Sequence, residues 1–181
     1  MTIKKLSIPQ VPLNTFKLAV LVSGRGSNLQ AIIDSIDREE LDAHLSIVIS
    51  NTKDAMALKR AEKHEIKTIF IDPSNYSSSK EYDKALVLKL KEFSIDLICL
   101  AGYMRILGEE IIQTFEKKII NIHPSLLPAF PGLNAQKQAI NHGVKFSGCT
   151  VHFVDSGVDS GPIILQTVVP VYDNDDEKSL S

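Results

Sequence analysis

Short, mostly apolar runs recur along the chain at fairly even spacing, and this recurrence limits the possible folds more than any other feature of the sequence. Each run has the length of a β-strand, and strands that are apolar on both faces are typical of a sheet covered on both sides. Six such runs occur at residues 18–22, 45–49, 68–71, 97–100, 119–122 and 150–154, and residues 162–169 could form a seventh.

Stretches with helical periodicity separate the first five runs. One has apolar residues at i, i+3, i+4 and i+7, which predicts an amphipathic helix, and Ser27 and Gln30 have capping-box spacing at its start. A second, less regular stripe predicts another helix between the third and fourth runs. The residues of the two stripes are Leu29, Ile32, Ile33 and Ile36, and then Ala85, Leu86, Leu88, Leu90 and Phe93.

The order of these elements predicts an open, doubly wound, Rossmann-like α/β fold with a mostly parallel sheet, because right-handed crossovers place helices on both faces. Beyond Asn141, strand-like runs follow one another without a helix, which predicts antiparallel pairing near the C-terminal end. We expect residues 1–16 to form a flexible leader, residues 17–172 a single domain, and residues 173–181 an acidic tail.

The composition is that of an ordinary globular protein, with 44% hydrophobic and 23% charged residues. The net charge of −2 argues against a broad basic surface for nucleic acid, and no apolar run approaches the roughly 20 residues of a membrane span. The first residues lack the charged and then apolar pattern of a signal peptide, so we expect a cytoplasmic protein.

Cys99 and Cys149 each lie in a strand-like run, where we expect both thiols to remain reduced.

Three segments lie where predicted strands end, and the carboxyl ends of strands are where open α/β sheets bind ligands. The first, residues 23–28, has glycines at 24 and 26 ahead of the first predicted helix. Glycine permits close approach and the first amides of a helix point outward, so this segment could bind an anion such as a phosphate. It matches neither a Walker A motif nor a dinucleotide fingerprint. A plain tight turn is an equally good interpretation of this segment alone.

The second segment, residues 101–107, has the sequence Ala-Gly-Tyr-Met-Arg-Ile-Leu. A mixed apolar loop with one arginine could line the pocket of a flat heterocycle. It could also be a hydrophobic turn that packs on the core, which is the better interpretation of this segment alone.

The third segment, residues 121–128, begins at the end of the fifth strand. Residues two apart in a strand point to the same side, so Asn121 and His123 should project together while Ile122 faces the core. An amide and an imidazole on one side form a donor pair that could stabilise an oxyanion. A lone histidine at a strand end is more often structural. Two features favour a functional role for His123. Asparagine lies two residues before it, and prolines at 124, 128 and 131 stiffen the loop that follows.

Asp159 belongs to a loop, residues 155–162, whose Asp and Gly content is typical of a turn. If this loop folds over His123, the carboxylate could orient the imidazole and favour its charged form. No metal site is expected, because the histidines at 44, 64, 123, 142 and 152 lack zinc-ligand spacing. Ser125 or Ser160 could in principle act as a nucleophile, but residues 23–26 do not form a nucleophile elbow.

Taken together, residues 17–172 resemble the folate-dependent formyltransferases, and most closely the branch that formylates phosphoribosylglycinamide in purine biosynthesis. The resemblance rests on Ser-Gly-x-Gly-Ser-Asn at 23–28, residues 101–107, Asn-Ile-His-Pro-Ser-Leu-Leu-Pro at 121–128, and the strand 151–154 that leads to Asp-Ser-Gly-Pro at 159–162. These four segments occur in the family's order, and the third is the most specific.

The resemblance implies a transferase that moves the formyl group of 10-formyltetrahydrofolate, its co-substrate, to the amine of 5-phosphoribosylglycinamide. Direct attack through a tetrahedral intermediate is implied, with Asn121, His123 and Asp159 as catalytic residues and no metal. Both substrates are small molecules, and a monomer or a homodimer is expected. The phosphate would contact Gly26, Ser27 and Asn28, and the folate would contact Met104, Arg105, Ile106, Leu107, Asn121, Asp155, Ser156, Gly157, Val158 and Asp159.

The chain departs from the family pattern at three places. Ser79, followed by Lys80, stands where an arginine commonly meets the folate tail, and Asn134 and Gln136 stand where histidines are common. The acidic tail stops before a further helix that most members have, which predicts a truncated end.

Three other functions could use parts of the same pattern. A formyltetrahydrofolate hydrolase would usually carry an additional N-terminal domain. A methionyl-tRNA formyltransferase would need a C-terminal tRNA-binding domain. A non-catalytic binder of a phosphorylated metabolite would use only the glycine-containing segment.

Overall fold

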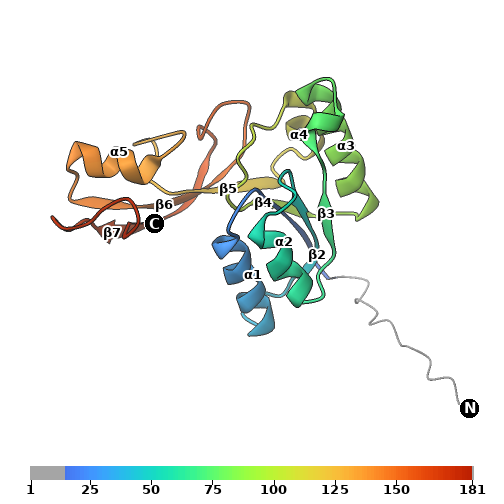
Figure 1. Cartoon of the computed structure of the whole chain (residues 1–181), viewed down its shortest axis with the longest axis horizontal. Helices are drawn as coiled ribbons and strands as arrows, with labels where there is room; N and C mark the ends of the chain where they lie inside the picture. The colour runs from blue at the N-terminus through green and yellow to red at the C-terminus, as the bar shows by residue number, and fades with distance from the viewer. Residues whose placement is uncertain (1–14, 181) are drawn as a thin grey trace, which may run out of the picture.

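All seven predicted strands are present and form one sheet, in the order β3-β2-β1-β4-β5-β6-β7 (Figure 1). This computed structural model describes residues 15–180, so most of the predicted leader lies outside the described residues. The strands are β1 (Lys17–Val22), β2 (His44–Ser50), β3 (Thr68–Phe70), β4 (Leu97–Leu100), β5 (Ile119–His123), β6 (Phe146–Phe153) and β7 (Ile163–Pro170). The helices are α1 (Ser27–Asp37), α2 (Met56–Lys63), α3 (Ser79–Glu92), α4 (Glu109–Thr114) and α5 (Ala135–His142), with a 3₁₀ turn at Pro73–Asn75.

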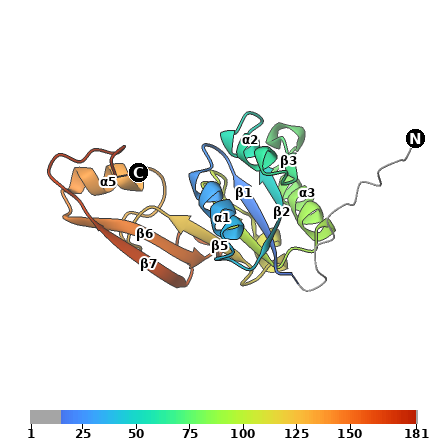
Figure 2. The ribbon, with the colours of Figure 1, turned by 90° about the horizontal axis from the view of Figure 1, so that it is seen from below.

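The pairing of the strands confirms the predicted fold class. Strands β3, β2, β1, β4 and β5 pair in parallel, whereas β5–β6 and β6–β7 are antiparallel. The hairpin of β6 and β7 extends the sheet away from the main body and carries α5 along one side (Figures 1 and 2). The change from parallel to antiparallel pairing comes next to β5, the strand that carries Asn121 and His123.

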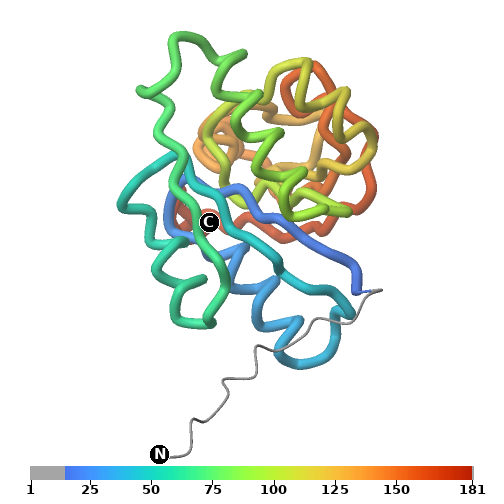
Figure 3. Tube along the Cα trace, turned by 90° about the vertical axis from the view of Figure 1, so that its right-hand side faces the viewer, coloured from blue at the N-terminus to red at the C-terminus, as the bar shows by residue number. Residues whose placement is uncertain are grey.

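Two hydrophobic clusters cover the two faces of the sheet. Ala19 and Leu21 of β1 pack into a cluster with residues of α3 and α4, whereas the alternating residues Leu18 and Val20 pack with α1 and α2. Strand β1 is therefore buried on both faces, which explains its continuous apolar run. Figure 3 shows the consequence from the side of β3: α1 and α2 lie on the opposite side of the sheet from α3.

Several details differ from the sequence prediction. Strand β6 begins at Phe146 rather than near residue 150, because Ser147 and Gly148 interrupt the apolar pattern without ending the pairing. Helices α2, α4 and α5 were not assigned from periodicity, since none is longer than 8 residues. The apolar stripe predicted for α3 is only partly confirmed, because Leu88, one of its residues, is 69% exposed. The residues of α3 that are buried are Tyr82, Asp83, Leu86, Val87 and Leu90.

The predicted capping box at the start of α1 is wrong. Gly26 occupies the N-cap position with φ of 75°, Ser27 is already the first helical residue, and no side chain caps the helix. The positive φ, which glycine adopts without strain, lets the chain enter the helix from the glycine-containing loop. The first amides of α1 therefore have no side-chain acceptor.

The two cysteines lie in strands β4 and β6, as predicted, and both are free and half-buried. Burial raises the pKa of the Cys99 thiol to about 11. Within residues 15–180, no helix has both the length and the apolar character needed to cross a bilayer.

Candidate active site at the carboxyl ends of β1, β4 and β5

The register of the sheet aligns the predicted segments along one edge. Leu21 of β1 pairs with Leu100 of β4, Leu100 pairs with Asn121 of β5, and Asn121 pairs with His152 of β6. Neighbouring strands lie about 4.8 Å apart, so the glycine-containing loop after β1 and the end of β5 are separated by only two strand spacings. The structure thus brings the three predicted segments to one edge of the sheet.

The glycine-containing loop is held against the start of α2. Ala57 N–H donates to the Gly24 carbonyl at 3.0 Å, and Arg60 Nε donates to the Arg25 carbonyl at 2.9 Å. A Cβ on Gly26 would lie 2.7 Å from the Cα and the Cβ of Ala57, so no side chain fits there. The close approach to α2 and the uncapped start of α1 together explain why glycine is needed at position 26.

Ser23 joins this loop to the segment that follows β4. Its hydroxyl donates to Asn51 Oδ1 at 2.6 Å and accepts from Met104 N–H at 2.8 Å, while Ser23 N–H donates to the Gly102 carbonyl at 3.1 Å. One serine therefore connects the carboxyl ends of β1, β2 and β4. Sequence reasoning gave Ser23 no separate role.

The segment after β4 combines both interpretations that the sequence left open. Leu107 is buried in the core, whereas Met104 and Ile106 are 67% and 75% exposed. Arg105 stacks on the ring of Tyr82 in α3, with 4.6 Å between the guanidinium carbon and the ring centroid. The core contacts fix the loop and leave two apolar side chains available at the surface.

Two further contacts from α3 hold this segment. The hydroxyls of Tyr82 and Tyr103 lie 2.9 Å apart, and Gly108 N–H donates to Asp83 Oδ2 at 2.7 Å. Burial raises the pKa of the Asp83 carboxyl, although the Gly108 hydrogen bond and the charge of Arg105 oppose this effect. Burial is also the main cause that raises the pKa values of Tyr82 and Tyr103.

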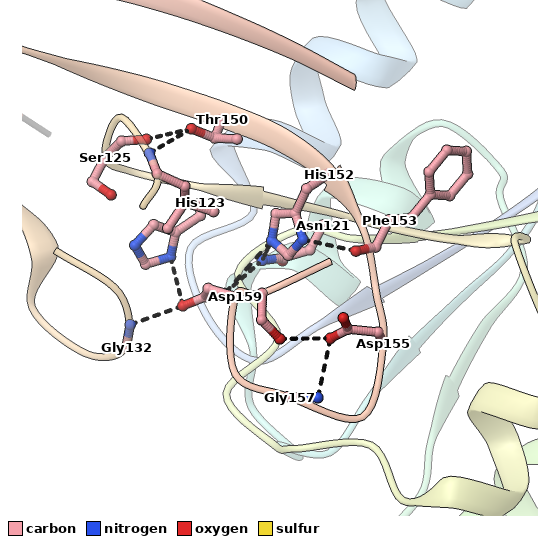
Figure 4. Close-up of polar contacts among 12 residues, drawn as sticks. Asn121, His123, Ser125, Gly132, Thr150, His152, Phe153, Asp155, Gly157 and Asp159 are labelled. Carbon is pink, nitrogen blue, oxygen red and sulfur yellow. Dashed lines mark hydrogen bonds and ion pairs between the residues drawn. The ribbon is translucent and has the colours of Figure 1, made fainter. Parts of the chain in front are cut away.

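Asp159 contacts both residues of the predicted donor pair (Figure 4). Its Oδ2 lies 3.1 Å from His123 Nδ1, and its Oδ1 accepts from Asn121 Nδ2 at 3.4 Å. The side chains of His123 and Asp159 are only 5% and 13% exposed. Asn121 and His123 thus lie on one side of β5, as predicted. The expectation that Ile122 faces the core is wrong, because Ile122 is only half-buried and belongs to neither core cluster.

The second nitrogen of His123 also faces an acceptor. Nε2 lies 2.8 Å from the carbonyl oxygen of Phe130, in the proline-containing loop after β5. A neutral imidazole has one N–H and can satisfy only one of these two acceptors, whereas the doubly protonated ring satisfies both. Both ring nitrogens of His123 therefore face hydrogen-bond acceptors.

The loop that carries Asp159 is tightly folded. Asp155 Oδ1 accepts from Gly157 N–H at 3.0 Å and from Ser160 Oγ at 2.8 Å, which forms an Asx turn. Asp159 itself has φ of 52°, a left-handed conformation that aspartate tolerates better than most residues. Gly132 N–H donates to Asp159 Oδ2 at 2.8 Å and fixes the carboxylate from the opposite side.

His152 is a member of this cluster that sequence reasoning did not assign to the site. It is 2% exposed, and its Nε2 lies 3.2 Å from Asn121 Nδ2 and 3.6 Å from Asp159 Oδ1. Only its position in β6 could have indicated this. When β6 pairs antiparallel with β5, the residue opposite Asn121 projects to the same side of the sheet as Asn121. Neither the pairing nor the register could be read from the spacing of the histidines.

Ser125, which was considered as a nucleophile, is fully buried and donates its hydroxyl to the Ala129 carbonyl. Within residues 15–180, no group of three or more His, Cys, Asp or Glu side chains has the arrangement of a metal site. The polar groups that converge at this edge are of the types that can transfer protons and bind an oxyanion.

Comparison with known proteins assigns the chain to a family. The family model described as formyl transferase matches residues 16–181. The chain belongs to the formyl transferase family.

The relatives of this chain include single enzymes and parts of larger proteins. Phosphoribosylglycinamide formyltransferase of Bacillus subtilis is 42% identical over 159 residues, which cover 88% of this chain and 82% of that protein. The human trifunctional purine biosynthetic protein adenosine-3 is 50% identical over 165 residues, which cover 91% of this chain but 16% of that protein. The chain therefore spans less than a fifth of the length of the trifunctional relatives.

The solved structures that resemble this chain are enzymes of the same kind. The crystal structure of glycinamide ribonucleotide transformylase 1 from Symbiobacterium toebii superposes with a TM-score of 0.90 at 48% identity, over 92% of this chain and 78% of that one. Phosphoribosylglycinamide formyltransferase from Bacillus halodurans superposes with a TM-score of 0.88 at 43% identity, over 91% and 84%. Over the shared residues, the chain has the fold of those enzymes.

Proposed function

We propose that this chain transfers the formyl group of 10-formyltetrahydrofolate to the amine of 5-phosphoribosylglycinamide, a step of de novo purine biosynthesis. The names of its relatives support this reaction. The observation that carries the proposal is the position of Asp159, whose two oxygens contact His123 and Asn121 on the same sheet edge as the uncapped start of α1. An anion site and a proton-transfer group at one sheet edge suit a phosphorylated amine substrate.

The phosphate of the ribonucleotide would bind at Gly26, Ser27 and Asn28. The amides at the start of α1 have no side-chain cap, and a helix N-terminus favours negative charge. Ser27 and Asn28 are exposed, so their backbone and side-chain donors can reach a ligand. The first turn of α1 contains no acidic residue that would repel a phosphate.

The folate would bind between the segment after β4 and the Asp159 loop. Met104 and Ile106 offer apolar surface to a flat pterin, and Arg105 is held in place by Tyr82. On the opposite side, residues 155–159 form the folded turn described above, with Val158 55% exposed. Leu107 would contribute to the pocket through its backbone, since its side chain packs in the core.

The chemistry would be direct attack of the substrate amine on the formyl carbon. The new C–N bond forms as the carbonyl electrons move to oxygen, and the tetrahedral intermediate collapses by breaking the bond from carbon to the folate nitrogen. The Asn121 amide and the His123 imidazolium would stabilise the negative oxygen. Asp159, together with a water molecule, would carry the proton from the attacking amine to the leaving nitrogen.

We expect the formyl oxygen to gain its donor at one contact of Asn121. The contact from Asn121 Nδ2 to Asp159 Oδ1 measures 3.4 Å, longer than the usual 2.7–3.2 Å of a strong N–H···O bond. This long contact is the one most easily exchanged for a hydrogen bond to substrate, and hydrogen bonds in catalytic sites commonly shorten only when the substrate is bound.

A formyl-transfer assay with 5-phosphoribosylglycinamide and 10-formyltetrahydrofolate tests the proposal. We expect production of tetrahydrofolate that requires the ribonucleotide and equals the formylated product in amount. Release of formate without the ribonucleotide would identify a hydrolase instead. Binding of both ligands without turnover would identify a non-catalytic binder.

We also propose that the enzyme acts in the cytoplasm on small-molecule substrates, without nucleic acid or membrane, as a monomer or a homodimer. The net charge of −2 supports this choice of partners, since it gives no broad attraction to phosphate backbones. Analytical ultracentrifugation over a range of concentrations would distinguish the monomer from the homodimer, and a larger assembly would contradict both.

A further inference from the structure

His152 has its hydrogen-bonding roles fixed by its surroundings. It lies in β6 directly opposite Asn121 of β5 and is 2% exposed. Its Nδ1 lies 2.8 Å from the carbonyl oxygen of Phe153. A carbonyl oxygen can only accept a hydrogen bond, so Nδ1 must carry the hydrogen.

When Nδ1 carries the only hydrogen of the ring, Nε2 has a lone pair. This atom lies 3.2 Å from Asn121 Nδ2, so it accepts a hydrogen bond from the Asn121 amide. If the amide were turned over, Asn121 Oδ1 would instead face this lone pair and the Asp159 carboxylate, which are both acceptors. The tautomer of His152 therefore selects the orientation of the Asn121 amide.

We propose that His152 is a positioning residue that holds the NH₂ group of Asn121 toward the reacting centre by acting as a fixed acceptor. The role in catalysis rests on the proposed formyl transfer, but the orientation of the amide does not. One hydrogen of Asn121 Nδ2 is committed to His152, and the other points to Asp159 along the longer, exchangeable contact. Without His152, the amide could present its oxygen to the formyl oxygen, and the two acceptors would repel each other.

The tautomer can be measured without any substrate. We expect long-range ¹H–¹⁵N correlation spectra of histidine-labelled protein to show His152 as the neutral ring with hydrogen on Nδ1. The His152 signals are assigned by their loss in His152→Gln. A neutral ring with hydrogen on Nε2, or a doubly protonated ring at neutral pH, would overturn the proposal, because neither can accept from Asn121.

Paired substitutions test the effect on catalysis. His152→Leu removes the acceptor, and we expect kcat to fall by about tenfold to a hundredfold with KM changed less than about threefold, as for partners that orient a reacting group. His152→Gln should recover most of the lost rate, because its side-chain oxygen can accept the same hydrogen bond. His44→Leu is the matched control, since His44 is a strand histidine at the start of β2, away from this edge.

The outcomes separate the two proposals. Wild-type kcat in His152→Leu, or equal losses in His152→Leu and His152→Gln with native circular dichroism, would overturn the positioning role. If His152→Leu does not fold, the tautomer measurement on the wild-type protein and the rate of His152→Gln decide the matter. A wild-type enzyme that transfers no formyl group would overturn the proposed function, whereas the tautomer would still decide how Asn121 is oriented.

Discussion

His123 Nδ1 lies 3.1 Å from Asp159 Oδ2, and the same oxygen accepts from Gly132 N–H at 2.8 Å. The imidazole is thus held between a carboxylate that is itself anchored and the carbonyl of Phe130. Two loops, the one between β5 and α5 and the one between β6 and β7, must fold together to produce this arrangement. The pair is nearly buried, so its electrostatic interaction is less screened than that of a surface ion pair.

Asp159→Asn tests the role of this carboxylate. The substitution keeps an oxygen that can accept from Gly132, and asparagine tolerates the left-handed φ of 52°, so the fold should persist. It removes the negative charge that faces His123 and the proton carrier. We expect kcat for formyl transfer to fall by about a hundredfold to ten-thousandfold, while the dissociation constants of both substrates, measured by calorimetry, stay within about threefold of wild type.

Asp173→Asn is the control for this substitution, because Asp173 is 91% exposed and contacts only the surface residue Lys145 among the interactions described. Its kcat should equal that of the wild type. Unchanged turnover in Asp159→Asn would remove Asp159 from the mechanism. Loss of ligand binding along with turnover would instead make it a binding residue.

Gly26→Ala should damage both the fold and the phosphate site. The added methyl would lie 2.7 Å from Ala57 Cα, and φ of 75° is unfavourable for alanine. We expect the free energy of unfolding in urea to fall by about 1–3 kcal/mol. The KM for the ribonucleotide should rise more than the KM for the folate, because the start of α1 must shift.

Gly24→Ala supplies the comparison within the same loop. A Cβ on Gly24 would meet no atom within 4 Å, so its free energy of unfolding should change by less than about 0.5 kcal/mol. Equal destabilisation by both substitutions would show that general loop flexibility, and not the contact of Gly26 with Ala57, determines the need for glycine.

The sheet was largely predictable from sequence because its central strands are buried on both faces. The apolar runs at β1, β2 and β4 mark the strands to within a residue or two, since a strand covered on both faces is apolar along its whole length. The sequence predicted the bounds of the hairpin strands β6 and β7 less clearly. Every residue of β7 is exposed, and Gly148 interrupts β6, so the pattern there depends on pairing rather than on a core.

The site was predictable in part. Asn121 and His123 followed from the alternation of side chains along one strand, which is a local property. Their partners could not be found in this way. His152 depends on the register between β5 and β6, and the contact of His123 with Phe130 depends on a loop conformation that no short pattern encodes. Asp159 was a weak candidate on local evidence and was assigned as their partner only through the family resemblance.

Cys99 should react slowly with alkylating reagents in the folded protein. Burial raises the pKa of its thiol to about 11, above the ordinary value of 9.0. At pH 8 the reactive thiolate is then about one part in a thousand, compared with about one in ten for the unfolded chain. Iodoacetamide labelling of Cys99, followed by peptide mass spectrometry, should accelerate about a hundredfold in denaturing urea. Similar rates in both conditions would mean that β4 opens readily in the native state.

Asp83→Asn should change how stability depends on pH. Burial raises the folded-state pKa of Asp83 above its ordinary value of 3.8, so the folded protein binds this proton more tightly than the unfolded chain. Stability from this group is therefore fully present below pH 3.8 and is lost as the pH rises through the higher folded-state pKa.

Asparagine at position 83 keeps an oxygen for Gly108 N–H and carries no charge to bury. We expect the unfolding free energy of the wild type, measured relative to Asp83→Asn, to decrease as the pH rises above 3.8. Asp42→Asn, at an exposed position, should show no such trend, and a constant difference for Asp83→Asn would mean that the Gly108 hydrogen bond fully compensates the burial of the charge.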